Sequence, residues 1–280
     1  CCSAARHAGV GAPPAVRLTP PNTAPDRARR PGCAFASPRS TSRPTAMAPP
    51  PGLEWLELAR GKSAAFSFYR WSVLGLTFVV YAVFHAARKP PSIVKSVLSP
   101  SEESGKAGWA PFDGPAGTAL LGNIDVAFLL AYAVGMFFAG HLGDSMDLRV
   151  FLSAGMAASG ILVSAFGMGY FWDVHSLWYY LAVSLMGGAL QSCGWPSVVS
   201  IVSNWFGKSK RGLVMGVWNA HTSVGNIAGA LVSSAMLKYG WGYSFVPLGM
   251  FMSAVGAAVY YLLVVSPEDV GLTPTGEAAA

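Results

Sequence analysis

Long apolar runs separated by short polar segments make up most of the chain between residues 69 and 265. Each run approaches or exceeds the ~20 residues that an α-helix needs to cross ~30 Å of hydrocarbon at ~1.5 Å per residue. Helix is the structure that such runs predict, because backbone polar groups in lipid must be satisfied within the segment. Six transmembrane helices are expected, at residues 69–88 or beyond, 120–141, 149–170, 176–203, 211–237 and 241–265. The pattern predicts an all-α membrane protein.

The two ends of the chain lack this pattern. Residues 1–52 are rich in Pro, Ala, Arg and Ser, cannot bury a core, and are expected to form a disordered leader. Because the first methionine is Met47, we expect residues 1–46 to be upstream translated sequence, although their Arg-rich composition also fits an organelle transit peptide. The six-helix domain is expected over residues 53–270, with a short surface helix at 53–62 and a disordered tail at 271–280.

Composition supports lipid as the solvent of much of the surface. The chain of 280 residues is 52% hydrophobic and 11% charged, whereas about a quarter of a soluble domain is charged. The net charge of +6 lies in residues 1–46, which hold seven arginines and one aspartate (7 − 1 = +6), so it does not indicate a nucleic-acid partner. No metal-ligand cluster, nucleophile motif or phosphate-binding glycine loop occurs, so we expect no cofactor, no metal and no enzymatic turnover.

The charges of the loops predict the orientation of the helices. Cytoplasmic loops of membrane proteins carry an excess of Lys and Arg. Seven basic residues fall on one side and four on the other; the seven are Arg60, Lys62, Arg70, Arg149, Lys208, Lys210 and Arg211. The N-terminus is therefore expected in the cytoplasm, while the loop 90–119 faces the opposite side and would cap the bundle. Loop charges carry no information on which membrane holds the protein.

Three polar side chains at the end of the first run form a candidate anion site. Tyr81, His85 and Arg88 are spaced four and three residues apart, so they share one face of a helix. If the helix continues through residues 92–98, Arg88 lies below the membrane surface, where a guanidinium would bind phosphate bidentately. If the helix ends at Arg88, the side chain would extend to the lipid headgroups instead. The residues alone leave both interpretations open.

His221 lies near the middle of the fifth run. An imidazole there would bind phosphate or carry a proton, or it would be a structural histidine bonded to a neighbouring helix. Asn219 is a further polar candidate in the same run, and Gly225 and Gly229 predict the close approach of another helix.

Two further segments are candidates for conformational roles. The turn at residues 140–149 holds Gly140, Asp144 and Arg149, which predict a charge latch that stabilises one state of a rocking protein; a solvated turn is the alternative. Residues 187–197 contain Pro196, which predicts a kink that lines a pathway, or a packing kink if Gln191 faces a neighbouring helix.

Several of these segments resemble a known family. The turn at 140–149 (Gly-His-Leu-Gly-Asp-Ser-Met-Asp-Leu-Arg) resembles the cytoplasmic signature of the major facilitator superfamily. The segments 81–89, 194–197 (Gly-Trp-Pro-Ser), 204–208 (Asn-Trp-Phe-Gly-Lys) and 218–226 are similar to the organophosphate:phosphate antiporters. The motif 108–115 (Gly-Trp-Ala-Pro-Phe-Asp-Gly-Pro) is similar to the plant glycerol-3-phosphate transporters within that family. The resemblance covers about residues 66–272.

The resemblance implies a fold, a function and a set of site residues. The fold is two six-helix halves, each a 3+3 inverted repeat, around a site at the membrane midplane. The function is exchange of glycerol-3-phosphate or a sugar phosphate for inorganic phosphate by alternating access. The implied substrate-binding residues are Arg88, which would hold the phosphate, and His221, Tyr81, Tyr132, His85 and Asn219. The implied conformational gate consists of Gly140, Asp144, Arg149 and Arg211.

The chain departs from the family pattern at three points. Met136 stands where bacterial members carry a lysine, and His85 where they carry a tyrosine, so the organic end of the substrate stays open. The family's second phosphate-binding arginine comes from a seventh helix, and this chain holds six apolar runs. We therefore expect an N-terminal half that needs the C-terminal half or a second chain, either as a truncated gene model or as a half-size protein. Alternative hypotheses are a non-transporting protein that associates with a full-length partner and a proton-coupled sugar carrier that uses His221.

Overall fold

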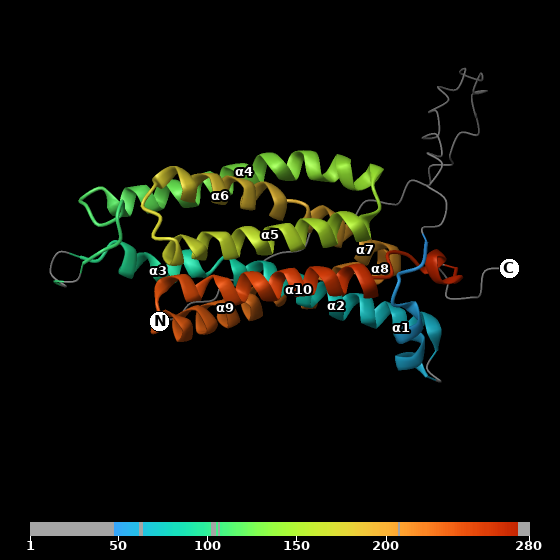
Figure 1. Ribbon diagram of the computed structural model, residues 1–280. Coiled ribbons are helices and arrows are strands. Elements are labelled where there is room, and N and C mark those ends of the chain that lie inside the picture. Colours follow the sequence, from blue (N-terminus) through green and yellow to red (C-terminus); the bar gives the residue numbers. More distant parts are fainter. Residues whose placement is uncertain (1–47, 62–63, 102–104, 106, 207, 274–280) are drawn as a thin grey trace, which may run out of the picture. The chain divides into compact units, whose positions relative to one another are not determined.

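The computed structural model describes residues 48–61, 64–101, 105, 107–206 and 208–273, with the side chains of residues 208–211 excepted. Most of the expected leader and tail lies outside these residues. Regular structure in the described part is helical (Figure 1). The elements are α1 (Leu53–Arg60), α2 (Ala65–Ala87), α3 (Pro90–Leu98), α4 (Gly117–Ser145), α5 (Leu148–Phe171), α6 (Leu177–Gln191), α7 (Gly194–Trp205), α8 (Lys208–Trp218), α9 (His221–Leu237), η2 (Trp241–Ser244), α10 (Val246–Leu262) and η3 (Pro267–Val270).

Four of the expected runs form helices that are long and apolar enough to cross a membrane: Ala65–Leu98, Gly117–Ser145, Leu148–Phe171 and Trp241–Leu262. The first comprises α2 and α3, so the helix continues past Arg88, and the first part of the expected loop 90–119 is helical. The run 176–203 forms α6 and α7, and the run 211–237 forms α8 and α9. These two expected helices are each divided into shorter ones, because the backbone turns at residues 192–193 and 219–220.

Proline accounts for two of the breaks. Pro90 and Pro91 begin α3 and cannot donate a hydrogen bond to the carbonyls four residues earlier, so the helical ladder is interrupted beside Arg88. Pro196 interrupts the ladder in the same way at the start of α7, close to Ser192 and Cys193. The break at residues 219–220 has no proline; there the Thr222 amide donates to the Asn219 carbonyl, three residues back, at 3.1 Å.

Small residues let three pairs of helices pack closely: α5 with α10, α4 with α6, and α2 with α9. A Cβ atom added at Gly225 of α9 would lie 2.2 Å from the Ala82 carbonyl oxygen of α2. At the crossing of α5 and α10, a Cβ at Gly160 would lie 2.5 Å from the Gly249 oxygen. The backbones therefore touch at these crossings, as membrane helices with small residues commonly do. This confirms the close approach that Gly225 and Gly229 predict.

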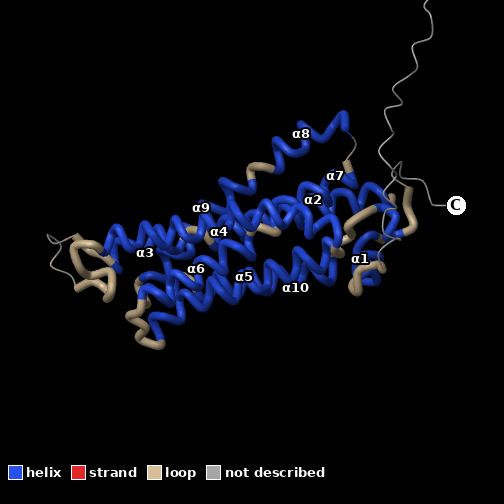
Figure 2. Tube along the Cα trace, turned by 90° about the horizontal axis from the view of Figure 1, so that it is seen from above, coloured by secondary structure: helices blue, strands red, loops and turns tan. Residues whose placement is uncertain are grey.

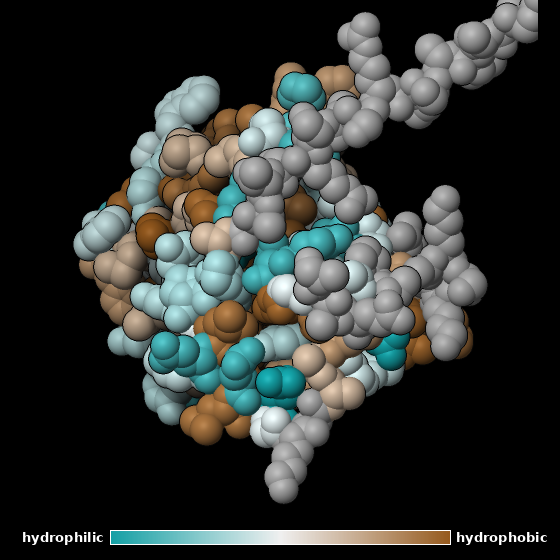
Figure 3. Space-filling view, turned by 90° about the vertical axis from the view of Figure 1, so that its right-hand side faces the viewer, coloured by the Kyte–Doolittle hydropathy of each residue, from teal (hydrophilic) through white to brown (hydrophobic). Residues whose placement is uncertain are grey.

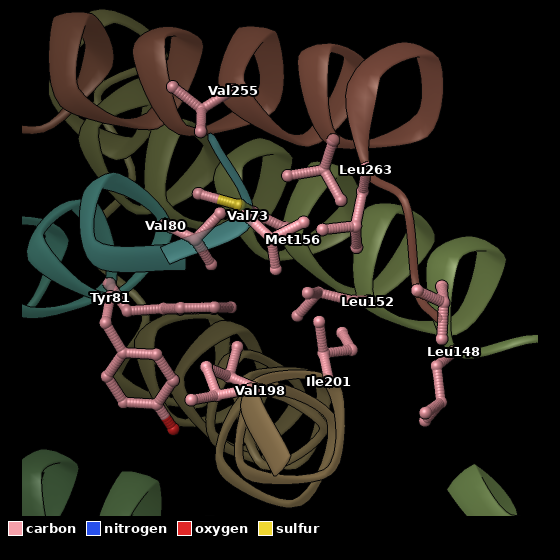
Figure 4. Packing of buried hydrophobic residues seen from close by; sticks show 14 of the residues in the cluster. Val73, Val80, Tyr81, Leu148, Leu152, Met156, Val198, Ile201, Val255 and Leu263 are labelled. Carbon is pink, nitrogen blue, oxygen red and sulfur yellow. The ribbon is translucent and has the colours of Figure 1, made fainter. Parts of the chain in front are cut away.

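An aliphatic cluster fills the space between α2, α5, α7 and α10 (Figure 4). Val80, Leu152 and Met156 are fully buried in it. Tyr81, which is buried, lies at its edge in Figure 4. The cluster therefore fixes the rotation of α2, and with it the direction in which the polar face of α2 points.

Other helix faces remain exposed and apolar. In α4, Val126, Leu130, Val134 and Phe138 are more than half exposed, and Phe137 is 82% exposed. In α8, Leu213 and Val217 are 77% and 70% exposed, and Figure 2 shows α8 standing away from its neighbours. Such surfaces need lipid or protein to cover them, since contiguous apolar patches are uncommon on surfaces in water.

The two ends of the bundle differ. One end carries α1, α7 and α8 (Figure 1), and Figure 3 looks onto this end, where hydrophilic residues are mixed with hydrophobic ones. At the other end, the segment that follows α3 packs against the turn between α5 and α6. The Trp109 indole donates to the Val174 carbonyl at 3.3 Å, and the Phe112 side chain is fully buried. This segment caps its end of the bundle, as the sequence predicted.

Candidate functional site

Arg88 lies in the interior of the first long helical segment. It is the C-cap of α2, and α3 follows it to Leu98. The ten residues from 89 to 98 (98 − 88 = 10) at ~1.5 Å each amount to about 15 Å, which is half of the ~30 Å hydrocarbon thickness. The position therefore supports the interpretation in which the guanidinium faces the inside of the bundle rather than the lipid headgroups.

Side chains from two other helices hold the Arg88 guanidinium. Its Nε donates to the Oε1 of Gln191 in α6 at 2.8 Å. The Cζ atom lies 4.6 Å from the centre of the Tyr132 ring and 5.7 Å from that of Phe128, both in α4. Cation–π contacts of this kind stabilise a charge that is withdrawn from water. A guanidinium has five N–H donors, so the bond to Gln191 leaves donors that can bind an anion.

Close packing of α6 on α4 places Gln191 beside Arg88. A Cβ at Gly188 would lie 2.2 Å from the Phe128 carbonyl oxygen, so only glycine permits this approach. Gln191 follows three residues later and is 2% exposed. Gln191 therefore faces a neighbouring helix, as the packing-kink interpretation expected, and it also contacts the candidate anion-binding residue.

A cavity of about 280 Å³ opens beside Arg88. Its walls come from α4, α5 and α6, the α2–α3 junction and Phe245, and they are mostly apolar; the polar residues that line it are Arg88, Ser92, Asp125, Ser184 and Gln191. Asp125 also forms an ion pair with Lys95 of α3. The charged groups around the cavity are thus a guanidinium on one side and a neutralised carboxylate on another, an arrangement that favours an anionic ligand near Arg88.

A second group of polar and aromatic side chains surrounds His221, which is 1% exposed. The Tyr81 ring centre lies 4.8 Å from that of His221, and the His85 ring centre lies 5.5 Å from it. Trp218 packs closest, at 4.1 Å. These residues come from α2 and from the α8–α9 junction, which the Gly225 crossing brings together.

The break between α8 and α9 provides the partner of His221. In a continuous helix, the Thr222 amide would donate to the Trp218 carbonyl. Here it donates to the Asn219 carbonyl instead, so the Trp218 carbonyl can accept from another group. The His221 Nδ1 lies 2.7 Å from that Trp218 oxygen. A carbonyl oxygen only accepts, so Nδ1 carries the proton, and Nε2 faces the Thr222 hydroxyl at 3.3 Å.

The structure brings most of the expected substrate-binding residues into these two groups. Tyr132 joins Arg88 in the first, and Tyr81, His85 and His221 form the second. His221 does not line the described cavity. Asn219 lies in the helix break, where its side chain is exposed.

The expected gate residues are only partly described. Gly140 and Asp144 lie in the last turns of α4, and Asp144 is exposed. Arg149 is 7% exposed, and its Nη2 lies 3.4 Å from the carboxylate of Asp147, which also caps α5. The acid that contacts Arg149 is therefore Asp147 rather than Asp144. The side chain of Arg211 lies outside the described part of the chain.

Sequence reasoning missed the roles of Thr222 and Trp218. Both occur in the segment 218–226 that carries the family resemblance, but their partners lie on other helices. The Trp218 indole donates to Thr77 of α2 at 3.3 Å, across 141 residues of sequence. The sequence feature that could have revealed these roles is a run of amide, imidazole and hydroxyl side chains at residues 219–223 inside an apolar stretch.

A family model described as Major Facilitator Superfamily matches residues 63–280. The chain belongs to the major facilitator superfamily. Membership and the long apolar helices together make it an integral, multi-pass membrane protein of a transporter family.

Individual members of the superfamily are also similar. An Arabidopsis thaliana protein provisionally named glycerol-3-phosphate transporter 1 is 51% identical over 248 residues, which cover 82% of this chain and 47% of that protein. The glucose-6-phosphate exchangers SLC37A2 of Xenopus tropicalis and Mus musculus are 46% and 45% identical, over 74% of this chain and 44% of each exchanger. The chain thus spans about half the length of these relatives.

Proposed function

We propose that this chain forms the phosphate-binding half of a transporter that exchanges an organophosphate for inorganic phosphate by alternating access. The observation that carries the proposal is the Arg88 guanidinium, which Gln191 and Tyr132 hold about 15 Å of helix away from the end of α3 at Leu98. A fixed, permanently charged fork matches the oxygens of a phosphoryl group, and intramembrane charges mark substrate pathways. The names of the relatives, which include glycerol-3-phosphate transporters and glucose-6-phosphate exchangers, favour a phosphorylated three-carbon or six-carbon compound.

We further propose six membrane spans related by an inverted repeat within residues 53–270. In this scheme α2–α3 corresponds to α6–α7, α4 to α8–α9, and α5 to η2–α10. The packing supports this scheme. When each helix is replaced by its equivalent, the pair α2 and α9 becomes the pair α6 and α4, and the pair α5 and α6 becomes the pair α10 and α2. All four of these pairs are in contact. The breaks beside Arg88 and Ser192 also fall in equivalent helices.

The proposed orientation places the N-terminus and the end that carries α1 and α7 in the cytoplasm, following the excess of basic residues in those loops. There, Gly140, Asp144, Arg149 and Arg211 would form the conformational gate, with Asp147 as the partner of Arg149. A second helical half, in the same chain or another, would cover the exposed apolar faces of α4 and α8 and complete the site.

Arg88→Lys tests the site. A lysine keeps the charge but cannot bond to Gln191 and bind two phosphate oxygens in the geometry of a planar fork. Exchange of radiolabelled phosphate by the full-length protein in proteoliposomes is expected to fall below detection. Arg70→Lys is the matched control, since Arg70 is also in α2 but stacks on Phe66 and Trp71 away from the site; this variant should exchange phosphate like the wild type.

The assay also separates the alternative functions. Wild-type exchange by Arg88→Lys would refute the assignment of the phosphate site. Uptake of unphosphorylated sugar that depends on a proton gradient would identify a sugar carrier. Co-purification with a full-length partner, without transport, would identify a non-transporting membrane protein.

A further inference from the structure

One hydroxyl group lies between two imidazoles, that of His221, which is buried, and that of His85, which is half-buried. The Oγ1 of Thr222 is 3.3 Å from Nε2 of His221 and 3.5 Å from Nε2 of His85. Thr222 and His221 belong to α9, and His85 belongs to α2. The hydroxyl is placed between the two rings by the crossing at Gly225 and Ala82, where the helix backbones touch.

The number of protons shared by His85, Thr222 and His221 determines which atom donates and which accepts in each hydrogen bond. A threonine hydroxyl has one proton, so it can donate to only one of the two Nε2 atoms and must accept from the other. The His221 proton on Nδ1 is engaged by the Trp218 carbonyl. In neutral His221, Nε2 therefore accepts from Thr222. His85 must then donate through Nε2–H, which leaves its Nδ1 unprotonated.

We propose that Thr222 is a positioning residue that makes His85 and His221 a proton relay, and that this relay takes up one proton when a phosphate dianion binds beside Arg88. The steps balance. A proton binds to Nδ1 of His85, the Nε2 proton of His85 moves to Oγ1, and the hydroxyl proton moves to Nε2 of His221. One proton enters, His85 is left neutral with its proton on Nδ1, and His221 becomes an imidazolium.

The surrounding charges link this uptake to anion binding. The groups that act on His85 are the cations Arg88 and Lys89 and the imidazole of His221, while Tyr81, Trp218 and Phe78 present aromatic rings to His221. The added charge rests on His221, whose ring centre lies 5.5 Å from that of His85, so a third positive charge joins the two cations and is unfavourable unless an anion neutralises them. Linkage is reciprocal: anion binding raises the affinity for the proton by the same factor as protonation raises the affinity for the anion. The inference rests on the proposed function for its anion, but the relay itself does not.

The first test counts protons. Binding of inorganic phosphate to the purified full-length protein is measured by calorimetry at pH 8 in two buffers with different heats of ionisation. The wild type should take up about one proton per bound phosphate, because the relay adds one proton to the pair of histidines. Thr222→Val, which removes the hydroxyl and keeps the shape, should lose at least half of this uptake, and Thr222→Ser should restore it. Ser223→Ala is the matched control, because Ser223 is the exposed neighbour in α9. Equal uptake by Thr222→Val and the wild type would overturn the relay.

The second test does not depend on phosphate binding. In ¹⁵N NMR spectra of the unliganded protein, His85 is expected as the Nε2–H tautomer in the wild type and in Thr222→Ser, and as a mixture of tautomers in Thr222→Val. An Nδ1–H tautomer of His85 in the wild type would overturn the proposal. Absence of phosphate binding, with the expected spectra, would refute the proposed function and leave the relay intact.

Discussion

The crossing of α2 and α9 predicts a large effect of a very small substitution. Gly225→Ala adds one Cβ atom 2.2 Å from the Ala82 carbonyl oxygen and 2.9 Å from the Ala82 carbonyl carbon. Ordinary contacts of a Cβ begin at 3.4 Å, so the helices must separate by about 1.2 Å (3.4 − 2.2 = 1.2). Both partners at this contact are backbone, so no flexible side chain can absorb the shift. Overpacking of this kind costs about 1–3 kcal/mol.

The measured quantity is the free energy of unfolding of purified protein in detergent, from titration with a denaturing detergent followed by circular dichroism. Gly75→Ala is the matched control, because a Cβ at Gly75 in α2 meets nothing within 4 Å. Both variants gain the same ~0.5–1 kcal/mol of helix propensity, so the difference between them isolates the clash. We expect Gly225→Ala to be less stable than Gly75→Ala by about 1–3 kcal/mol.

The same shift affects the site. Moving α9 away by about 1 Å would take the 3.5 Å contact between Thr222 and His85 beyond hydrogen-bonding distance. Gly225→Ala should therefore also reduce proton uptake on phosphate binding. Equal stability of Gly225→Ala and Gly75→Ala would show that the two backbones are not in contact. The arrangement of side chains around His221, which depends on that contact, would then be wrong as well.

Two further predictions concern Gln191 and His175. Gln191→Leu removes the acceptor for the Arg88 Nε; a hydrogen bond to a charged group contributes ~1.5–3 kcal/mol, so phosphate affinity should fall ~10–100-fold. Unchanged binding by Gln191→Leu in calorimetry would contradict the placement of Arg88. At the opposite end of the bundle, the Ala110 carbonyl that accepts from Nδ1, together with the Asp173 carboxylate, raises the pKa of His175. Because the folded pKa exceeds the unfolded value of ~6.5, this contribution to stability is complete below pH ~6.5 and is lost as the pH rises through the folded pKa. Hydrogen exchange of the Trp109 amide, corrected for its intrinsic rate, should therefore show less protection at pH 8.5 than at pH 6, and His175→Gln should abolish the difference.

The helices were largely predictable, because a membrane span depends on local hydropathy. The runs at 120–141 and 149–170 correspond closely to α4 and α5. The division of the runs at 176–203 and 211–237 was less accessible. Pro196 predicted a kink in the former. At the break at residues 219–220, the Thr222 amide bonds to the Asn219 carbonyl instead of the Trp218 carbonyl, and hydropathy gives no sign of such a change.

The candidate site was predictable as a set of residue types but not as an arrangement. The spacing of Tyr81, His85 and Arg88 placed them on one helix face, and the structure confirms that their rings and guanidinium face other helices. The spacing did not show which partners they meet. Gln191 is 103 residues from Arg88, and Thr222 is 137 residues from His85. The partner of Arg149 also differed from expectation, because the N-cap geometry of Asp147 brings its carboxylate toward Arg149.

The sequence by itself determined that this is a membrane protein, that its chain forms apolar helices, and which ionisable side chains those helices carry. Those properties follow from composition and from positions three and four residues apart. Only the tertiary structure decided that Arg88 bonds to Gln191, that one threonine lies between two histidines, and that Tyr81 packs on His221. The reason is that these contacts depend on where helices cross. The crossings are set by glycines such as Gly188 and Gly225, whose neighbours are backbone atoms of helices far away in the sequence.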